Sequence, residues 1–573
     1  MQRKPTDVGN GVVCASFGTD GSWLSVGAHH PRLGLVELTG APPFPERLDG
    51  DGPAVREHRA RLVDPSCAML RVVGADAADA AAHAEAGTIV QEMRVRAGRS
   101  LTIEFSGRLA RPGYAEITPV GPIPPGLPPT LLRADGPTLE VSVPGSAPPV
   151  HALVTVTATG AQPIGWVTGG SGATARVSGA GSATELRIAV TMDVPTASPR
   201  TVAAPAAGRS DDVLDLVGGG AERYTLGCTA LEVADGRCCI VTDHRLLPLS
   251  WTRDAYYQAA LLLARQESPE ALGVVERHLA WLWGPGRDES GVWQRSHLTT
   301  GAVKDPAYQA DQQLYPLLEL ADFRRVARRW PATHSAAAWG TLTRRVWSGL
   351  PRDAPGLLPG EENPADDPSD LPYLLSSQLL LTYTARRLAE WEDELQLADL
   401  GLADDAARSL AAIRAVFGCD GPYGAQWAYE TDGQGTHRRY HDANDVPTAL
   451  APVWGLCAAD DPRWLATMRF AWSPSNPGYV PGVLGGLGSA HTPGVWPLGD
   501  AQEWAVAMTT GDEEAARRVL DRISRVVSDD GMLPETYDPE TGDWLARHWF
   551  GWPGALVGLV DRTLRHGRGP WVG

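Results

Sequence analysis

The spacing of apolar residues changes once along this 573-residue chain, and that change constrains the fold more than any other feature. Before about residue 195, apolar and polar residues alternate, as in 101–105, 139–143 and 186–192. Alternation between Gly/Pro turns is typical of half-buried antiparallel strands. Beyond about residue 211, apolar residues recur at helical spacing, as at Val519 and Ile523. The sequence therefore predicts two regions of different structural class.

We predict a multidomain chain, with an N-terminal antiparallel β-sandwich (residues 1–195) followed by an all-α (α/α)6 toroid (residues 216–573). The segment 196–215 between them is rich in Pro, Ala and Ser, which is typical of a linker. Roughly a dozen candidate helices, including 252–266 and 307–329, would alternate between an inner and an outer ring. The polar connections between the helices would then form a site at one mouth of the ring.

Charge and cysteine content narrow the classes of function. The net charge of −18 argues against a nucleic-acid partner, which requires a basic face. No apolar run reaches the roughly 20 residues that span a bilayer, and the N-terminus has no apolar signal core, so we expect no membrane partner and a cytoplasmic protein. Seven cysteines without a CxxC pair predict neither a disulfide framework nor a zinc site. The adjacent Cys238 and Cys239 are expected to be buried in a strand.

Tryptophan is concentrated in the predicted helical domain. Trp23 and Trp166 are the only tryptophans before residue 250, and the other 18 of the 20 follow it. Indole rings fill large cores and also stack on the apolar faces of sugars. Core packing must account for most of them, because no single site holds so many.

Four polar clusters in the helical domain are candidates for a site. They are 249–258, 361–370, 429–447 and 531–552. Each also has a plain structural interpretation, such as a helix cap, a solvated loop or, for the five carboxylates of 361–370, a structural calcium site. Crowding of carboxylates raises some of their pKa values, which would keep one acid protonated near neutral pH. Hydrolysis of a glycosidic bond needs two carboxyl groups, one on each side of the bond. One would come from the cluster 361–370, and the other would be Glu535.

The order of short motifs resembles that of glycoside hydrolase family 125, the exo-acting α-mannosidases, and more distantly that of families 15 and 63. The matching motifs are Trp251-Thr252-Arg253-Asp254, Tyr308-Gln309-Ala310-Asp311, Pro364-Ala365-Asp366-Asp367, Tyr429-Glu430-Thr431-Asp432-Gly433, Asp442-Ala443-Asn444, Gly488-Ser489-Ala490-His491-Thr492, Val495-Trp496-Pro497, Leu533-Pro534-Glu535-Thr536 and Arg547-His548-Trp549-Phe550-Gly551-Trp552.

This resemblance implies an inverting hydrolase with an oligosaccharide or glycoside substrate. It implies that the general acid is Asp367, with Asp366 as the second choice, and that the base is Glu535. The candidates for binding the sugar are Trp251, Arg253, Asp254, Asp311, Glu430, Asp442, Asn444, His491, Trp496, Arg547 and Trp549. We expect no cofactor and no catalytic metal. The oligomeric state is not predicted.

Other functions on the same fold remain open. The motif Leu533-Pro534-Glu535-Thr536 and the large sandwich are closer to glucoamylase-like enzymes, so the alternative is an α-glucosidase or another α-glycosidase. A phosphorylase would need phosphate in place of the carboxylate at Glu535. A polysaccharide lyase would need a basic groove, which an acidic chain does not favour. A non-catalytic glycan binder would retain affinity without releasing product.

Overall fold

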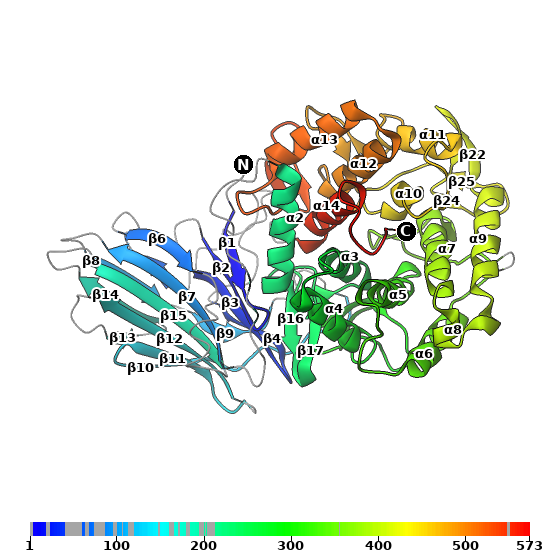
Figure 1. Ribbon diagram of the computed structural model, residues 1–573. Helices are drawn as coiled ribbons and strands as arrows, with labels where there is room; N and C mark the ends of the chain where they lie inside the picture. The colour runs from blue at the N-terminus through cyan, green and yellow to red at the C-terminus, as the bar shows by residue number, and fades with distance from the viewer. Residues whose placement is uncertain are drawn as a thin grey trace.

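The N-terminal part of the chain forms β-sheets and the remainder is mainly helical, as a computed structural model shows (Figure 1). The last strand of the sheets ends at Asp193 and the first long helix begins at Val213. The structure describes residues 4–18, 23–39, 60–62, 68–73, 86–95, 100–105, 107–112, 120–146, 149–159, 165–169, 172–178, 184–193, 200, 202, 212–353, 356–546 and 550–572.

Two antiparallel sheets make up the N-terminal region. The larger has the order β1-β2-β3-β5-β8-β14-β13, with β4 and β9 branching from β3. Its strands are β1 (Thr6–Gly9), β2 (Val13–Phe17), β3 (Trp23–His30), β4 (Gly34–Thr39), β5 (Ala60–Leu62), β8 (Ser100–Phe105), β9 (Arg108–Ala110), β13 (Trp166–Gly169) and β14 (Gly172–Ser178). The smaller has the order β10-β11-β12-β15-β7-β6. Its strands are β6 (Ala68–Val73), β7 (Ala86–Val95), β10 (Leu131–Asp135), β11 (Thr138–Val143), β12 (Val150–Thr159) and β15 (Thr184–Asp193).

The alternating pattern of the sequence accounts for the core between these sheets. On β15, Ile188 and Val190 are buried and lie opposite Val156 and Val154 of β12. Both sheets contribute apolar side chains to one cluster, and the Trp166 Nε1 of the larger sheet donates to the Val154 carbonyl of the smaller at 3.2 Å. Alternate residues point to one face of a strand, so one face of each sheet is apolar. The region is therefore a sandwich, as predicted.

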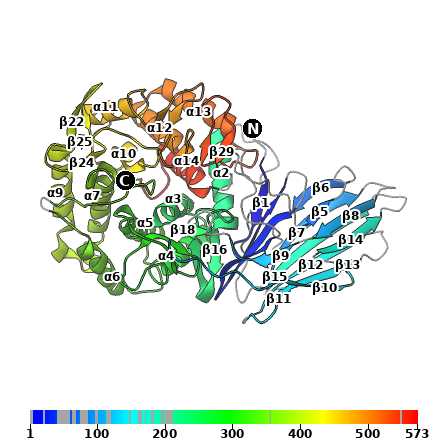
Figure 2. The ribbon, with the colours of Figure 1, turned by 180° about the vertical axis from the view of Figure 1, so that it is seen from behind.

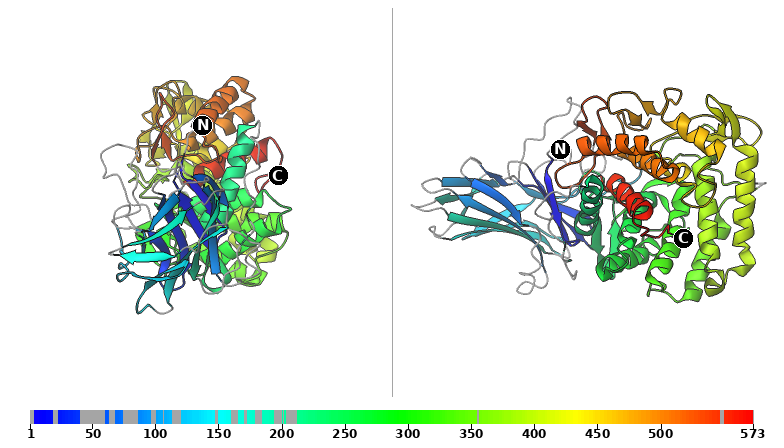
Figure 3. Two further views of the ribbon diagram at one scale, coloured as in Figure 1. Left: turned by 90° about the vertical axis from the view of Figure 1, so that its left-hand side faces the viewer. Right: turned by 45° about the horizontal axis from the view of Figure 1, so that its top comes forward.

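Six helices contact one another in a closed cycle, in the order α3, α5, α7, α10, α12, α14 and back to α3. Four further helices pack on the outside of this ring: α2 on α14, α4 on α3 and α5, α9 on α7, and α13 on α12. The helices are α2 (Val213–Tyr224), α3 (Thr252–Leu263), α4 (Pro269–Leu282), α5 (Tyr315–Ala327), α6 (Ala336–Gly349), α7 (Leu375–Ala389), α8 (Glu392–Leu395), α9 (Leu402–Val416), α10 (Val446–Leu450), α11 (Pro462–Ala471), α12 (Pro497–Thr510), α13 (Glu513–Val526) and α14 (Gly551–Leu564). Seen from behind (Figure 2) and with the top tilted forward (right panel of Figure 3), the sheets lie to one side of the ring.

Inner and outer helices differ in amphipathicity. Every residue of α3 is buried, so this helix has no solvent face. The outer helix α13 buries Val519 and Ile523 and exposes Glu513 and Glu514, which makes it two-faced. A helix buried on all sides must lie inside the fold, whereas an amphipathic one lies at its surface. Among the described residues, no helix combines the length and apolar character needed to cross a membrane.

Most helices lie where the spacing of apolar residues predicts them, but one start was wrong. The predicted helix 307–329 begins only at Tyr315, because its first residues form strand β20 (Val303–Tyr308), which pairs with β19 (Gln294–Leu298), and a short 3-10 turn. Pro316 near the N-terminus of α5 is compatible with a helix start there. Cys238 and Cys239 are buried in β17 (Arg237–Ile240), as expected.

The sandwich and the helical region are joined by close backbone contacts. Gly11 N donates to Gly227 O at 2.9 Å, and Glu232 N donates to Gly11 O at 2.7 Å. Most of the predicted linker, 196–215, lies outside the described residues. Within it, Arg200 is buried and donates to the carbonyls of Leu226 and Ala230, while α2 already begins at Val213.

Candidate active site

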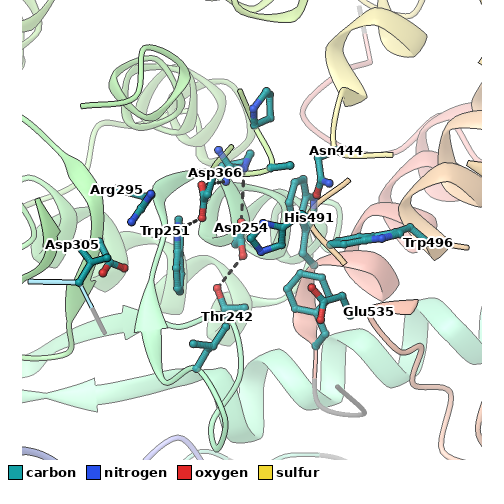
Figure 4. A pocket seen from close by; sticks show the side chains of 17 residues that line it. Thr242, Trp251, Asp254, Arg295, Asp305, Asp366, Asn444, His491, Trp496 and Glu535 are labelled. Carbon is teal, nitrogen blue, oxygen red and sulfur yellow. Dashed lines mark hydrogen bonds and ion pairs between the residues drawn. The ribbon is translucent and has the colours of Figure 1, made fainter. Parts of the chain in front are cut away.

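The residues that precede the inner helices meet at one cavity of about 210 Å³ (Figure 4). It is lined by Val120, Thr242, Leu247, Trp251, Arg253, Asp254, Arg295, Asp305, Pro364, Ala365, Asp366, Asn444, His491, Trp496, Glu535, Phe550 and Trp552. Except for Val120, these residues lie in the connections that lead into the inner helices or in the first turns of those helices. The N-terminal ends of the inner helices therefore surround one mouth of the ring, where their dipoles favour negative charge.

Arg253 is the centre of the polar network at this cavity. Its Nη1 lies 2.9 Å from Asp311 Oδ2, and its Nη2 lies 3.0 Å from Asp366 Oδ1. The guanidinium carbon also lies 5.5 Å from the ring centroid of Trp552. Burial lowers the pKa of Arg253, but the charges of Asp311, Asp366 and Asp254 outweigh it and raise the pKa above its ordinary value. The arginine is therefore a permanent cation that fixes the carboxylates around it.

Asp366 is held on both carboxylate oxygens. Its Oδ2 accepts from Trp251 Nε1 at 3.0 Å, and its Oδ1 accepts from Gln309 Nε2 at 2.7 Å as well as from Arg253. The backbone at Asp366 is left-handed, with φ of 66°. The Asn363 side chain stabilises this turn, because its Oδ1 accepts from the amides of Ala365 and Asp367. A tight turn thus directs Asp366 into the cavity.

Asp367 lies beside the cavity and does not line it. Its Oδ1 is 3.5 Å from Nδ1 of His491, which does line the cavity. Its Oδ2 is buried and has no hydrogen-bond partner among the described residues. The two adjacent aspartates therefore have different surroundings, one clamped by donors and one facing a histidine.

Glu535 comes from the connection before α14 and is only 3% exposed. It lines the same cavity as Asp366. Its Oε1 lies 3.4 Å from the hydroxyl of Thr492, and its backbone amide donates to Ala546 at 3.2 Å. Figure 4 shows Glu535 and Asp366 on different sides of the cavity, with His491 between them in this view. Two carboxylates from distant parts of the sequence therefore share one pocket.

The acidic loop 361–370 contains one carboxyl group whose pKa is raised. Burial raises the pKa of Glu362, although Arg295 at 3.1 Å and an amide hydrogen bond from Gln309 act in the opposite direction. Glu362 does not line the cavity, but its partner Arg295 does. The loop thus holds an acid with a raised pKa, but burial is the main cause and the charge of Asp366 only adds to it, whereas crowding of carboxylates was the expected cause.

The carboxylate of Asp442 positions Asn444. Asp442 Oδ1 accepts from the backbone and side-chain nitrogens of Asn444 at 2.7 and 2.8 Å, and its Oδ2 accepts from the Tyr440 hydroxyl at 2.7 Å. Burial raises the pKa of Asp442, against these hydrogen bonds. Asn444 reaches the cavity and Asp442 lies behind it.

The structure gathers most of the residues predicted for the site. Those that line the cavity are Trp251, Arg253, Asp254, Asp366, Asn444, His491, Trp496 and Glu535. Three more predicted residues do not line the cavity but each contacts a residue that does: Asp311, Asp367 and Asp442. Glu430 is more remote, because it is buried on β24 (Glu430–Thr431) beside Arg438 and accepts from the amide of Leu371. Arg547 and Trp549 lie outside the described residues.

Several lining residues were not among the predicted ones. Arg295 and Asp305 lie on a hairpin before α5, and Val120 comes from the sandwich. Nothing local in the sequence marks them, because a hairpin or a distant loop is brought to the pocket only by the fold. Trp552 had a signal, since it ends the aromatic motif that begins at Arg547.

A metal site can be sought among clusters of carboxylates and histidines. Within the described residues, the ligand atoms of Asp215, Asp561 and His566 lie within 4.8 Å of one another. Asp561 is already paired with Arg565 at 3.1 Å, and none of the three lines the cavity. This cluster therefore does not bear on the chemistry at Asp366 and Glu535.

The helical ring and its carboxylate-lined mouth can be compared with those of known proteins. Residues 329–560 match the family model of the metal-independent α-mannosidases, glycoside hydrolase family 125. It is 28% identical over 222 residues to the Meiotically up-regulated gene 157 protein of Schizosaccharomyces pombe. That match covers 36% of this chain and 42% of the yeast protein, so the chain spans less than half of that relative.

Solved structures support the fold. A metal-independent α-mannosidase from Streptococcus pneumoniae, in a complex with α-1,6-mannobiose, aligns with a TM-score of 0.53 and 20% identity over 62% of this chain and 94% of its own. A bacterial glucoamylase complexed with acarbose aligns with a TM-score of 0.53 and 12% identity over 100% of this chain and 97% of its own. The first likeness covers about the length of the helical region, and the second covers the sandwich as well.

Proposed function

We propose that the protein is an exo-acting, inverting α-glycoside hydrolase, by preference an α-mannosidase, whose helical ring is an (α/α)6 toroid. The observation that carries this proposal is that Asp366 and Glu535, from two distant connections, line one cavity. The match to the metal-independent α-mannosidases supports the choice of sugar. The cavity of about 210 Å³ is smaller than most ligand pockets, which are commonly about 300–1,000 Å³, and suits the end of a glycan rather than a long internal stretch.

Glu535 is the proposed base. In inversion, a carboxylate removes a proton from water, and the water attacks the anomeric carbon from the face opposite the leaving group. Glu535 is buried, lines the cavity and has its Oε1 3.4 Å from the hydroxyl of Thr492. A water held between Glu535 and the sugar would therefore give its proton directly to this carboxylate and not to bulk solvent.

Asp366 is the proposed acid, with Asp367 as the alternative. A general acid must reach the glycosidic oxygen, and Asp366 lines the cavity whereas Asp367 contacts it through His491. This reverses the order that the sequence resemblance implied. Both oxygens of Asp366 already accept hydrogen bonds, so a proton there must displace one donor when the substrate binds. Catalytic hydrogen bonds commonly rearrange in this way on substrate binding.

Four other lining residues would bind the terminal sugar. Asp254 and Asn444 offer acceptors and donors for hydroxyl groups, and Trp496 and Trp552 offer apolar faces. Thr242 donates to Asp254 Oδ2 at 2.7 Å and so orients this carboxylate. Fixed polar groups on an aromatic wall favour a neutral, hydroxyl-rich ligand.

A second candidate is an α-glucosidase. The likeness to the bacterial glucoamylase includes the N-terminal sandwich, whereas the likeness to the α-mannosidase covers 62% of the chain. Both sugars would use the same two carboxylates, so the geometry of the acid and base does not separate them. A panel of aryl α-mannosides and α-glucosides separates the two by their relative kcat/KM.

The roles of the carboxylates can be tested with two substrates. α-Mannosyl fluoride needs no protonation of its leaving group, whereas α-1,6-mannobiose does. Asp366→Asn should lower kcat for mannobiose roughly a thousandfold and spare the fluoride, whereas Glu535→Gln should abolish both reactions. Asp367→Asn is the matched control on the neighbouring residue. Proton NMR of the wild-type reaction should show β-mannose as the first product.

Each result has a clear consequence. If Asp367→Asn, and not Asp366→Asn, loses only mannobiose hydrolysis, Asp367 is the acid. First formation of α-mannose would exclude inversion. Ordinary activity of Glu535→Gln on both substrates would reject the two-carboxylate mechanism at this site.

A further inference from the structure

One residue of the sandwich reaches the rim of the cavity. Val120 lies between β9 and β10, is 51% exposed, and is the one residue of the described part of the N-terminal region that lines the cavity. Its neighbours on the cavity wall include Arg295 and Asp305 of the β19–β20 hairpin. The pocket is therefore built from both regions of the chain.

The hairpin holds this segment in place. The Lys304 side chain is fully buried, and its Nζ donates to the Val120 carbonyl oxygen. Gly121 follows with φ of 74°, and a Cβ at this position would lie 1.7 Å from the Lys304 carbonyl oxygen. Only glycine allows so close an approach of the two backbones. A buried ammonium and a glycine contact thus fix the position of Val120 relative to the helical ring.

Beside Val120 there is a buried carboxylate with spare hydrogen-bonding capacity. Asp305 is 1% exposed, and its Oδ2 accepts from the Ser296 hydroxyl at 2.5 Å. Its Oδ1 accepts no hydrogen bond from any described residue, and Lys304 Nζ lies 3.8 Å away. Buried polar atoms normally have a hydrogen-bond partner, so an oxygen that has a long ion pair with Lys304 and no hydrogen bond within normal distance points to a ligand donor at this cavity wall.

This part of the cavity lies on the side of the proposed acid. Arg295 pairs with Glu362, which belongs to the same loop as Asp366. In Figure 4, Trp251 lies between Asp305 and Asp254, and its indole nitrogen donates to Asp366. The acid protonates the oxygen of the leaving group, so a group on this side of Asp366 meets the leaving sugar.

We infer that Val120 of the sandwich, together with Arg295, Asp305 and Trp251, forms the subsite for the sugar on the leaving-group side of the bond. This inference rests on the proposed function. Val120 provides an apolar contact, while Asp305 accepts from a sugar hydroxyl and Arg295 donates to another. The N-terminal region is then part of the substrate-binding site, and Val120 helps to determine which leaving sugar is accepted.

The test compares a substrate that fills this subsite with one that does not. α-1,6-Mannobiose has a leaving sugar, whereas α-mannosyl fluoride loses only fluoride. Val120→Trp should lower the ratio of the two kcat/KM values about tenfold, mainly through a higher KM for mannobiose. Gly121→Val, which pushes the segment away from Lys304, should lower the ratio in the same direction. Val167→Trp is the matched control, because Val167 is a 68% exposed valine of the same region that does not line the cavity.

The outcomes separate this inference from the function on which it rests. An unchanged ratio in both Val120→Trp and Gly121→Val, with active wild-type enzyme, overturns the subsite and leaves the hydrolase proposal intact. An equal fall in Val167→Trp also overturns it. Wild-type enzyme that hydrolyses neither substrate rejects the α-mannosidase proposal and this subsite with it.

Discussion

The core of the sandwich and the mouth of the helical ring are both buried, but they are filled in opposite ways. Between the sheets, aliphatic side chains such as Val154, Ile188 and Val190 pack against one another. At the mouth of the ring, Arg253 lies among Asp311 and Asp366 at hydrogen-bonding distance. Burying charges costs free energy that hydrophobic packing does not cost. This difference indicates that the ring mouth is organised for binding and chemistry, and the sheet core for stability.

Removing Arg253 should have the largest effect, because it disturbs both the stability of the ring mouth and its chemistry. Arg253→Met leaves the buried Asp311 and Asp254 and the half-buried Asp366 without their cation. We expect the free energy of unfolding to fall by about 4 kcal/mol. We also expect kcat/KM to fall roughly a thousandfold, as when a preorganised donor is removed. Chemical denaturation and steady-state kinetics measure the two effects.

A second buried arginine provides the control. Arg387 lies 2.9 Å from Asp322 and does not line the cavity. Arg387→Met should cost a similar free energy of unfolding and leave kcat/KM unchanged in the folded enzyme. Equal losses of activity in both variants would show that the Arg253 effect is only structural.

The sandwich should respond in the reverse manner. Ile188→Ala removes a fully buried side chain and should lower the free energy of unfolding by about 3 kcal/mol, because it leaves a cavity. Activity at low temperature should persist, because Ile188 is remote from the pocket lining. Thr157→Ala on the neighbouring strand is the control, since Thr157 is exposed. Thermal unfolding of the three proteins measures the difference, and loss of activity in folded Ile188→Ala would contradict the separation of roles.

Lowering the pH should reduce the free energy of unfolding of the helical region by less than the substitutions above. Burial lowers the pKa of His278 to about 4, so the folded protein keeps this ring neutral. The unfolded chain binds a proton near pH 6.5. The stabilising contribution is therefore present above pH 6.5 and is lost as the pH falls toward 4. The slope should be about 1.4 kcal/mol per pH unit for this group.

The measurement is denaturant unfolding between pH 6.5 and 4.5 in wild type and His278→Leu. The free energy of unfolding of His278→Leu should depend less on pH than that of the wild type, by about 1.4 kcal/mol per pH unit. His441 and His244, whose pKa values burial also lowers to about 4, remain in both proteins and cancel in the difference. Equal slopes would mean that His278 is protonated in the folded state.

The sequence predicted some parts of this site better than others for a physical reason. Trp251, Arg253 and Asp254 share one short motif, so their proximity follows from the chain itself. Glu535 and Asp366 were identified as carboxylates in polar connections, but their meeting at one cavity requires the ring to close. Val120 and Asp305 carried no local signal, because their role depends on how the sandwich lies against the hairpin. Which of Asp366 and Asp367 lines the cavity also depended on the turn at Asn363, which directs Asp366 into it.

The order of strands and helices, the two-region organisation and the acidic motifs were determined by the sequence, because periodicity and turn residues act over a few neighbours. Which carboxylates share a cavity, and which residue of the sandwich joins them, was decided only by the tertiary structure. These pairings join residues far apart in the chain, and their geometry depends on the packing of whole helices and sheets rather than on any local preference.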